Sequence, residues 1–437
     1  MTKNRFISNT SWILAGQVVK MIISLFVSLL TARYLGPSNQ GVITYVASYI
    51  SFFTSLIGLG LNGVIIHEFV NHQEDEGKIL GTAIVLRFAS SVISFVAFIA
   101  LIYCIDSNDN TIITVAFLQA IQLPFLCLDT INYWYQAKLL SKYPTIVQTI
   151  AYVITSAYKV YLLCAGNNVL WFAFAVTLDI IVMAILYLAI YLKHKTQKLG
   201  FSGIIAKRLL KSGLPFILAN IMVVIYGQMD RIMIKQMLGS TTEVGLYSTA
   251  IAVCSIIGFI PSAILDSARP LIAEAKKADE EKYKLRFRQL VAGLMWVCFL
   301  YSAFITVFSK PLLNLMYGDA YIGANICLKI AVWYTAFSYI GSARSFWLIC
   351  ENKKRYVFYF SALGAALNLI LNLILIPVMG INGAALATLV TQIMANFIIP
   401  LLFKDTRDYG RAIICGITLR NIELKSALNK IKFKIFK

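Results

Sequence analysis

The stretch VGLYSTAIAVCSIIGFIPSAIL (residues 244–265) is 22 residues long and carries no charged side chain. A helix of roughly 20 apolar residues is long enough to cross the hydrocarbon core of a bilayer. The whole chain has this character, because 59% of its 437 residues are apolar and only 14% are charged. Soluble domains usually carry about 25% charged residues. The composition, with a mean hydropathy of +0.76, therefore excludes a soluble enzyme and favours a polytopic membrane protein.

Eleven further apolar segments flank this stretch, so the sequence predicts an all-α polytopic membrane protein with twelve transmembrane helices. The first segment contains Lys20, and no small-residue cleavage site follows it, so we interpret it as a span and not as a signal peptide. The predicted spans are 10–32, 42–65, 80–104, 111–134, 144–164, 168–192, 213–234, 244–265, 290–309, 323–349, 357–377 and 383–403.

Basic residues are distributed unevenly between the two sides of these spans. The loops and tails on the side of the N-terminus carry 30 Lys and Arg residues, whereas the opposite loops carry 3. Cytoplasmic loops of membrane proteins collect Lys and Arg, so both termini are predicted to be cytoplasmic. The net charge of +19 has the same explanation. No groove-reading motif or detached basic domain is present, so we expect no nucleic-acid partner.

The spans divide into two groups of six, separated by a basic segment. We predict an N-terminal six-helix lobe (1–192), a basic cytoplasmic linker (193–212), a C-terminal six-helix lobe (213–403) and a basic cytoplasmic tail (404–437). The linker is either an amphipathic helix lying on anionic lipid or a solvated connection. The tail is expected to be a helix on the membrane surface, or else disordered.

The two groups also resemble each other in sequence. Gly36 and Gly239 each follow a leucine at the end of a span, and each precedes a Gly-Tyr segment that opens the next span. The two glycines are 203 residues apart, as are the first residues of spans one and seven. Six spans per unit give both units the same orientation. Unless these short loops match by chance, the pattern indicates a parallel pseudo-two-fold repeat, which is typical of transporters.

Charged residues at membrane depth are the main functional candidates, because an ionisable group in lipid costs several kcal/mol and usually faces a cavity or a partner. The candidates for binding the substrate are Lys20, Arg87, Lys159, Arg231, Lys329 and Arg344. The candidates for a coupling ion or a counter-ion are Asp129, Asp179 and Asp230. A net positive interior favours a phosphate or diphosphate, since Arg forms bidentate phosphate bonds and Lys supplies a point charge.

Each of these residues also has a structural interpretation. Arg87 could extend to the cytoplasmic surface, and Asp230 and Arg231 could lie at the opposite interface. Any of the acids could pair with a buried base. Among the neutral residues, Asn368 and Asn372 share one helix face and are expected to bridge helices more than to line a wet path.

Signatures of catalysis and of metal binding are missing from the sequence. It has no Walker A loop, paired carboxylates, zinc motif or nucleophile elbow, and its eight cysteines form no CxxC pair. We therefore expect no enzyme activity, no metal and no cofactor, although transport could be coupled to a proton or sodium gradient.

Five motifs together resemble the polysaccharide flippases of the multidrug/oligosaccharidyl-lipid/polysaccharide exporter superfamily. They are LTARYLGPSNQGVITY (30–45), NYWYQAKLLSKY (132–143), QMDRIMIKQMLG with VGLYSTA (228–250), ARPLIAEAKK (268–277) and NLILNLILIPVMGINGAALATLVTQ (368–392). The basic or acidic positions that match the family are Arg33, Arg87, Asp230 and Arg231. The related lipid II flippases usually have two further C-terminal spans where this chain has a basic tail, which argues against that subgroup.

The resemblance implies a function and a location. Members of the family carry undecaprenyl-diphosphate-linked oligosaccharide repeat units across the bacterial cytoplasmic (inner) membrane, for O-antigen (in lipopolysaccharide), capsule or exopolysaccharide assembly. It implies two six-helix lobes in a V shape, alternating access and a cationic central cavity. The expected partners are the lipid-linked glycan, membrane lipid and the polymerase of the same pathway. The alternatives are a cation-coupled multidrug exporter of the same fold, and a membrane polysaccharide polymerase.

Overall fold

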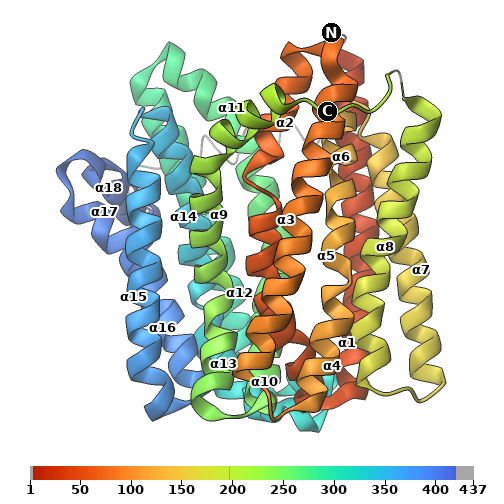
Figure 1. The fold of residues 1–437 in the computed structure, drawn as a ribbon. Helices are drawn as coiled ribbons and strands as arrows, with labels where there is room; N and C mark the ends of the chain where they lie inside the picture. The colour runs from red at the N-terminus through yellow and green to blue at the C-terminus, as the bar shows by residue number, and fades with distance from the viewer. Residues whose placement is uncertain (1–2, 196, 420–437) are drawn as a thin grey trace. The chain divides into compact units, whose positions relative to one another are not determined.

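The computed structural model describes residues 3–195 and 197–419, and every regular element in these ranges is helical (Figure 1). The all-α fold class is therefore confirmed. The first helices are α1 (Lys3–Ile57), α2 (Leu61–Asn71), α3 (Glu76–Ile105), α4 (Asn110–Ala120), α5 (Gln122–Phe125), α6 (Thr130–Ala137), α7 (Lys142–Cys164) and α8 (Val169–His194). The next are α9 (Gly203–Leu238), α10 (Thr241–Ser255), α11 (Phe259–Ala278), α12 (Glu280–Tyr317), α13 (Asn325–Ala331) and α14 (Tyr334–Cys350). The last are α15 (Arg355–Met379), α16 (Ile381–Ile393), α17 (Ile399–Leu402) and α18 (Arg407–Thr418).

Twelve membrane spans can be traced through these helices. Ten helical segments of the described chain are long and apolar enough to cross a bilayer, and α13 and α14, bent by 47°, form an eleventh span. The first segment, Ile23–Asn71, has 49 residues, or roughly 74 Å of helix at 1.5 Å per residue. This length is more than twice the thickness of the hydrocarbon core. The segment contains a break at Gly36, so it supplies two spans, as the sequence predicted.

Several predicted spans are irregular or longer than expected. The predicted span 111–134 consists of α4, α5, a 3₁₀ turn (Leu126–Asp129) and α6, and the charge-free stretch 244–265 is interrupted by a 3₁₀ turn at Ile256–Gly258. α9 begins ten residues before the predicted span 213–234, so half of the predicted linker is helical. The described part of the basic tail includes α18, and the residues from 420 onward lie outside the described residues.

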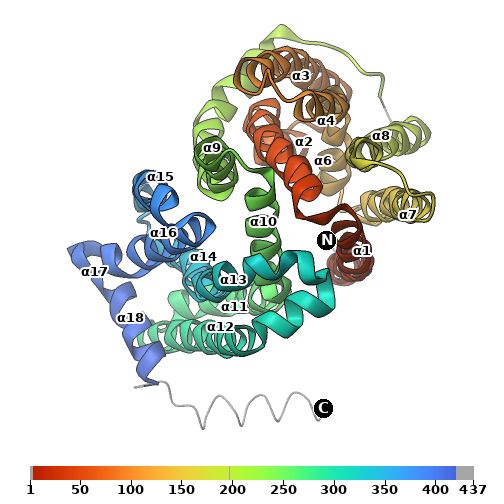
Figure 2. The ribbon, with the colours of Figure 1, turned by 90° about the horizontal axis from the view of Figure 1, so that it is seen from below.

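The chain forms two compact units, Met1–Gly245 with Met316–Ala320, and Leu246–Leu315 with Tyr321–Lys437. The core of the first unit includes Leu61, Leu80 and Trp134, and that of the second includes Leu294 and Trp347. In the first unit, α7 and α8 lie side by side in both views (Figure 1, Figure 2). The division into lobes at the linker 193–212 stays a prediction.

The two glycine turns of the predicted repeat both have a positive φ but differ in ψ. Gly36 has φ 71° and ψ 171°, and Gly239 has φ 68° and ψ 8°, and glycine adopts both conformations at little cost because it has no Cβ. Just beyond these turns, the hydroxyl oxygens of Ser38 and Thr241 lie 3.2 Å apart. These two residues are also separated by 203 positions. Equivalent residues of the two repeats therefore meet, which supports the predicted parallel repeat.

Two further glycines allow the backbones to approach each other at this contact. A Cβ atom on Gly41 would lie 1.8 Å from the carbonyl oxygen of Thr241, and one on Gly245 would lie 1.9 Å from that of Pro37. The contacts are reciprocal, because each turn presents a glycine to a carbonyl of the other. Such mutual contacts are the signature of a two-fold axis. We name this close approach, formed by Pro37, Gly41, Thr241 and Gly245, the glycine contact.

Candidate functional site

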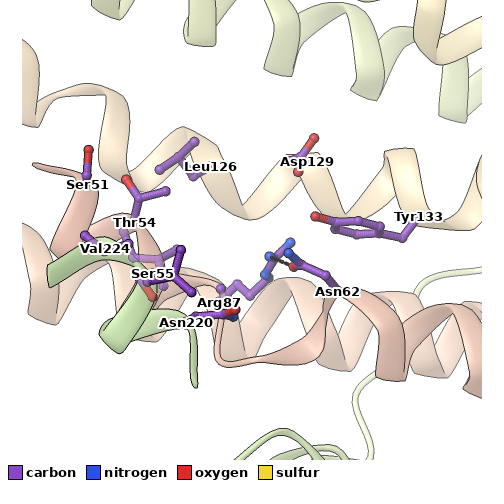
Figure 3. A pocket seen from close by; sticks show the side chains of 13 residues that line it. Ser51, Thr54, Ser55, Asn62, Arg87, Leu126, Asp129, Tyr133, Asn220 and Val224 are labelled. Atoms are coloured by element: carbon purple, nitrogen blue, oxygen red, sulfur yellow. Dashed lines mark hydrogen bonds between the residues drawn. The ribbon is translucent and has the colours of Figure 1, made fainter. Parts of the chain in front are cut away.

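A pocket of about 320 Å³ lies within the first unit, between α1, α3, α9 and the segment that joins α5 to α6 (Figure 3). It combines one basic, one acidic and several neutral polar side chains with a few apolar ones. The lining residues are Ser51, Thr54, Ser55, Ile57, Gly58, Asn62, Arg87, Leu126, Asp129, Tyr133, Asn220, Val223 and Val224.

A break in the backbone between α1 and α2 shapes one wall of this pocket. Leu59 and Gly60 have φ values of 49° and 63°, so the chain leaves the α1 axis and re-enters a helix at Leu61. A Cβ on Gly60 would lie 2.3 Å from the carbonyl oxygen of Gly213, so close packing of α9 requires glycine here. The break places Asn62 in the first turn of α2, where its side chain meets Arg87.

Arg87 is the basic group of this pocket. It lies 11 residues into α3, or about 16 Å along the helix axis, and its relative exposure is 5%. Its Nη2 donates to Asn62 Oδ1 at 2.9 Å, and its Nη1 donates to Thr130 Oγ1 at 3.1 Å. The guanidinium carbon lies 5.4 Å from the centre of the Tyr133 ring. This burial contradicts the alternative in which Arg87 extends to the cytoplasmic surface.

The contacts of Arg87 leave its charge available to a ligand. Both hydrogen bonds go to neutral oxygens, and in the described part of the chain its Nε has no hydrogen-bond partner. A buried donor without a partner costs about 1–3 kcal/mol, and more in a charged group. Asp129 lines the wall that faces Arg87 and contributes an opposite charge at longer range (Figure 3). Arg87 therefore lines the pocket as a cation that neutral groups hold in place, while its Nε is itself buried.

Neutral polar side chains around Arg87 provide further hydrogen-bonding groups in the pocket. Ser51, Thr54 and Ser55 share one face of α1, and Asn220 approaches from α9. Hydroxyl and amide groups beside an arginine can donate hydrogen bonds to an anionic oxygen-rich group such as a phosphate. The carboxylate of Asp129 would repel an anionic ligand that came close to it. Binding of a proton or a cation to Asp129 would remove this repulsion.

Asn62 is expected to position Arg87. Replacing Asn62 with leucine would remove the 2.9 Å acceptor and leave a second guanidinium nitrogen without a partner. We expect transport to fall by about five- to 20-fold, whereas Asn62→Gln, which keeps a neutral amide acceptor, should retain more activity. Initial transport rates at matched protein levels would test this expectation. Equal rates for Asn62→Leu and the unaltered protein would contradict it.

The other basic candidates of the first unit have different surroundings. Lys20 is partly buried on α1, with its Nζ 5.3 Å from the Tyr152 ring centre. Lys159 on α7 experiences the charge of Asp179 on α8, whose carboxylate also accepts a hydrogen bond from Thr155. The hydrogen bond from Thr155 therefore joins α7 to α8, with Lys159 within electrostatic range of the same carboxylate.

Three candidates lie on α9 and α13. Arg231 donates from Nη1 to Gln228 Oε1 at 2.7 Å within its own helix, and the neighbouring Asp230 is buried. Lys329, on α13 in the second unit, is exposed, and so is Arg33 on α1. Among the nine candidates, the described pocket brings together Arg87 and Asp129. A substrate contact for the others stays a prediction.

Arg344 of the second unit has a structural partner. It is buried on α14, its Nη1 donates to the carbonyl of Ala395 at 2.6 Å, and its guanidinium carbon lies 5.1 Å from the Phe360 ring centre. Ala395 belongs to a π-helical segment, Met394–Ile398, where the α-helical hydrogen-bond register is interrupted. The asparagine pair also bridges helices, because Asn368 contacts both Asn372 and Thr388 of α16.

The comparisons with known proteins concern both halves of the chain. The family model described as polysaccharide biosynthesis protein matches residues 6–276, and a model described as MatE matches residues 215–374. A putative O-antigen transporter of Shigella flexneri is 24% identical over 337 residues, which are 72% of this chain and 77% of the relative.

Solved structures of transporters share the fold. The lipid II flippase MurJ in an inward closed conformation superposes with a TM-score of 0.71 at 15% identity, over 92% of this chain and 90% of that one. An inward-facing multidrug resistance MATE family transporter gives a TM-score of 0.63 at 15% identity, over 94% and 99% of the two chains. At these identities the likeness concerns the fold alone.

Proposed function

Because the chain belongs to the polysaccharide biosynthesis protein family of this exporter superfamily, we propose that it translocates a lipid-linked oligosaccharide across the bacterial cytoplasmic membrane. The substrate class is an undecaprenyl-diphosphate-linked repeat unit of O-antigen, capsule or exopolysaccharide. The relative named as a putative O-antigen transporter supports this class. The excess of Lys and Arg on the side of the N-terminus supports an orientation in which both termini face the cytoplasm. In this proposal the protein is a transporter and not an enzyme.

The observation that carries the proposal is the state of Arg87. A buried guanidinium that is held by the neutral oxygens of Asn62 and Thr130 is costly within a membrane unless an anion offsets its charge. A diphosphate is an anion that must cross the membrane interior when a lipid-linked glycan is flipped. Bidentate bonds from arginine to phosphate are among the strongest hydrogen bonds available to a side chain.

In the mechanism that we propose, the diphosphate binds in the pocket at Arg87 while the prenyl chain stays in the bilayer. Lys20, Lys159 and Arg231 add positive charge along the path, which lowers the cost of moving the diphosphate through a medium of low dielectric constant. Rocking of the two lobes about the pseudo-two-fold axis then exposes the glycan on the opposite side. Asp129 can bind a coupling proton or sodium ion, which would weaken the repulsion between its carboxylate and the diphosphate.

Disruption of the gene tests this function. We expect surface glycan to be lost and lipid-linked repeat units to accumulate with the glycan on the cytoplasmic side. Restoring the intact gene should reverse both effects. Unchanged surface glycan, together with unchanged amounts of lipid-linked intermediates, would contradict the proposal.

A cation-coupled multidrug exporter is the second candidate, because the MatE model matches residues 215–374 and Asp129 lines the pocket. Such an exporter would protect cells from cationic drugs. The strain with the disrupted gene distinguishes the flippase from the exporter. Increased drug accumulation with intact surface glycan would favour the exporter. A polymerase is disfavoured by the transporter fold.

A further inference from the structure

A second hollow runs along α15, entirely within the second unit. It has a volume of about 430 Å³. Its lining includes Tyr356, Tyr359, Phe360, Leu363 and Ala366 of α15, together with Phe403. The α15 residues recur every three or four positions, so they lie on one face of the helix. Their ten-residue span gives the hollow a length of about 15 Å. We name it the α15 groove.

The α15 groove is accessible and apolar. Tyr359, Leu363 and Phe403 are all exposed, and the ring centres of Phe360 and Phe403 lie 5.8 Å apart. Atoms that line an unfilled apolar hollow lose dispersion contacts, so such a hollow favours an apolar occupant. In a membrane, the abundant occupant of this shape is a lipid hydrocarbon chain.

Basic residues surround one end of the α15 groove. They precede α15, begin it or follow Phe403, and are Lys353, Lys354, Arg355, Lys404 and Arg407. We name this set the basic rim. A single carboxylate, Asp405, lies within it and accepts a hydrogen bond from Tyr356 Oη at 2.5 Å. The nearest Arg355 nitrogen is 4.0 Å from this carboxylate. The rim and Asp405 together carry a net charge of +4.

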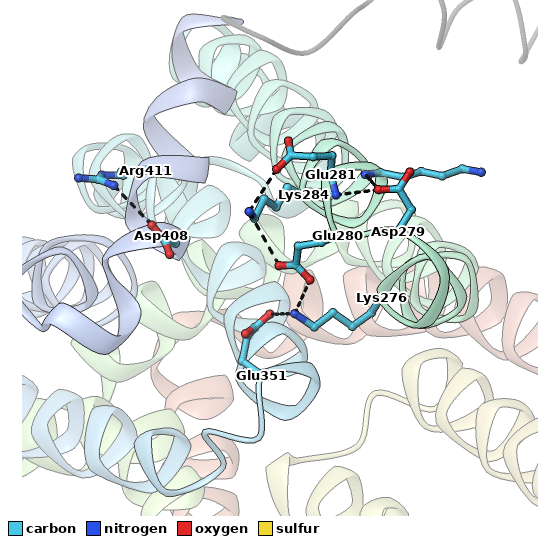
Figure 4. A network of polar contacts seen from close by, with 9 residues as sticks. Lys276, Asp279, Glu280, Glu281, Lys284, Glu351, Asp408 and Arg411 are labelled. Carbon is cyan, nitrogen blue, oxygen red and sulfur yellow. Dashed lines mark hydrogen bonds and ion pairs between the residues drawn. The ribbon is translucent and has the colours of Figure 1, made fainter.

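Other carboxylates at this end of the second unit are paired with different bases. Lys276 Nζ contacts Glu351 at 2.7 Å and Glu280 at 2.9 Å, and Arg411 lies 3.5 Å from Asp408 (Figure 4). These acids therefore do not neutralise the basic rim.

Two lysines of the basic rim remain available for an anion. Lys354 and Lys404 are exposed, and neither forms an ion pair with any carboxylate of the described chain. A basic rim at the end of an apolar groove complements an anionic lipid. The rim fits the negatively charged headgroup, and the groove fits a hydrocarbon chain.

We propose that the α15 groove binds one anionic phospholipid, with a hydrocarbon chain along α15 and the phosphate against Lys354 and Lys404. Each basic residue near an anionic headgroup is worth about 1 kcal/mol, so the two lysines together raise the affinity by about 30-fold. The site lies outside the Arg87 pocket and does not depend on the proposed function. Its occupant is a resident lipid and not the transported one.

Photo-crosslinking in vesicles tests this assignment. The photoreactive amino acid p-benzoylphenylalanine would replace Leu363 in the groove or, as a control, Ile374, which is exposed on α15 outside it. The protein would be reconstituted in equal amounts of phosphatidylglycerol and phosphatidylcholine, and the attached lipids counted by mass spectrometry. At position 363 we expect about 30-fold more phosphatidylglycerol than phosphatidylcholine, and at position 374 nearly equal amounts.

Matched variants separate the rim from general surface charge. Lys354→Ala with Lys404→Ala should bring the lipid ratio at position 363 close to one. Lys277→Ala with Lys282→Ala removes two exposed lysines elsewhere in the second unit and should leave the ratio unchanged. Ala366→Phe should fill the groove and reduce attachment of both lipids. Equal ratios at positions 363 and 374, or preferred attachment of an added polyprenyl phosphate, would overturn the proposal.

Discussion

Replacing Arg87 with alanine is expected to reduce transport of the lipid-linked glycan by roughly 100-fold or more. The guanidinium is buried, is held by two neutral acceptors and belongs to a residue that lines the pocket. Removing it deletes charge-assisted bonds that are each worth about 1.5–3 kcal/mol, with no other base lining this pocket. Surface glycan in cells that carry the variant as their single copy would report the loss.

Two further variants make this prediction specific. Arg87→Lys keeps the charge but loses the planar fork, so transport should be intermediate. Arg269→Ala removes an exposed arginine that is paired with Asp266 on its own helix, and should have little effect. The amount of each variant in the membrane would be measured in parallel. Full export by Arg87→Ala at normal protein levels would remove this residue from the site.

Replacing Gly41 with alanine is expected to destabilise the protein by about 2–4 kcal/mol. The new methyl group would lie 1.8 Å from the carbonyl oxygen of Thr241, so the two backbones of the glycine contact must separate. We expect a fall in the midpoint of thermal unfolding of roughly 2–4 °C. Gly63→Ala is the matched control, because a Cβ there has no atom within 4 Å.

The reciprocal glycine sharpens this prediction. Gly245→Ala should cost about as much as Gly41→Ala, since its methyl group would lie 1.9 Å from the Pro37 carbonyl oxygen. The double variant should cost clearly less than twice as much, because either methyl group alone already opens the contact. A melting midpoint for Gly41→Ala equal to that of Gly63→Ala would show that the glycine contact does not form.

Much of the fold could be predicted from the sequence because bilayer thickness fixes the length of each apolar segment. The glycine turns at 36 and 239 were also predictable, since both sit between apolar runs at the same offset. The breaks inside spans were not predicted. The bend between α13 and α14 lies in continuous apolar sequence, where helix packing decides the backbone. The 3₁₀ turn at 256–258 comes shortly before Pro261, which has no N–H to donate to the carbonyl of Ile257.

The candidate site was predicted less completely. Arg87 was found because a charge in an apolar span is conspicuous. Its partners Asn62 and Thr130 are 25 and 43 residues away and are ordinary polar residues, so tertiary structure alone brings them together. The Gly58–Gly60 pair was the available signal, because it marks a break beside Asn62. The sequence also could not show that Lys329 is exposed, since composition does not reveal the face that a helix presents.

Binding of undecaprenyl diphosphate to the purified protein tests the central claim most directly. Native mass spectrometry would compare the unaltered protein, Arg87→Ala and Arg269→Ala, with undecaprenol as the uncharged lipid. The account predicts that Arg87→Ala weakens binding of the diphosphate by at least about 30-fold, whereas Arg269→Ala leaves it unchanged. All three proteins should bind undecaprenol, which carries no charge, with equal affinity. Equal affinity of Arg87→Ala and the unaltered protein for the diphosphate would contradict the claim that Arg87 recognises it.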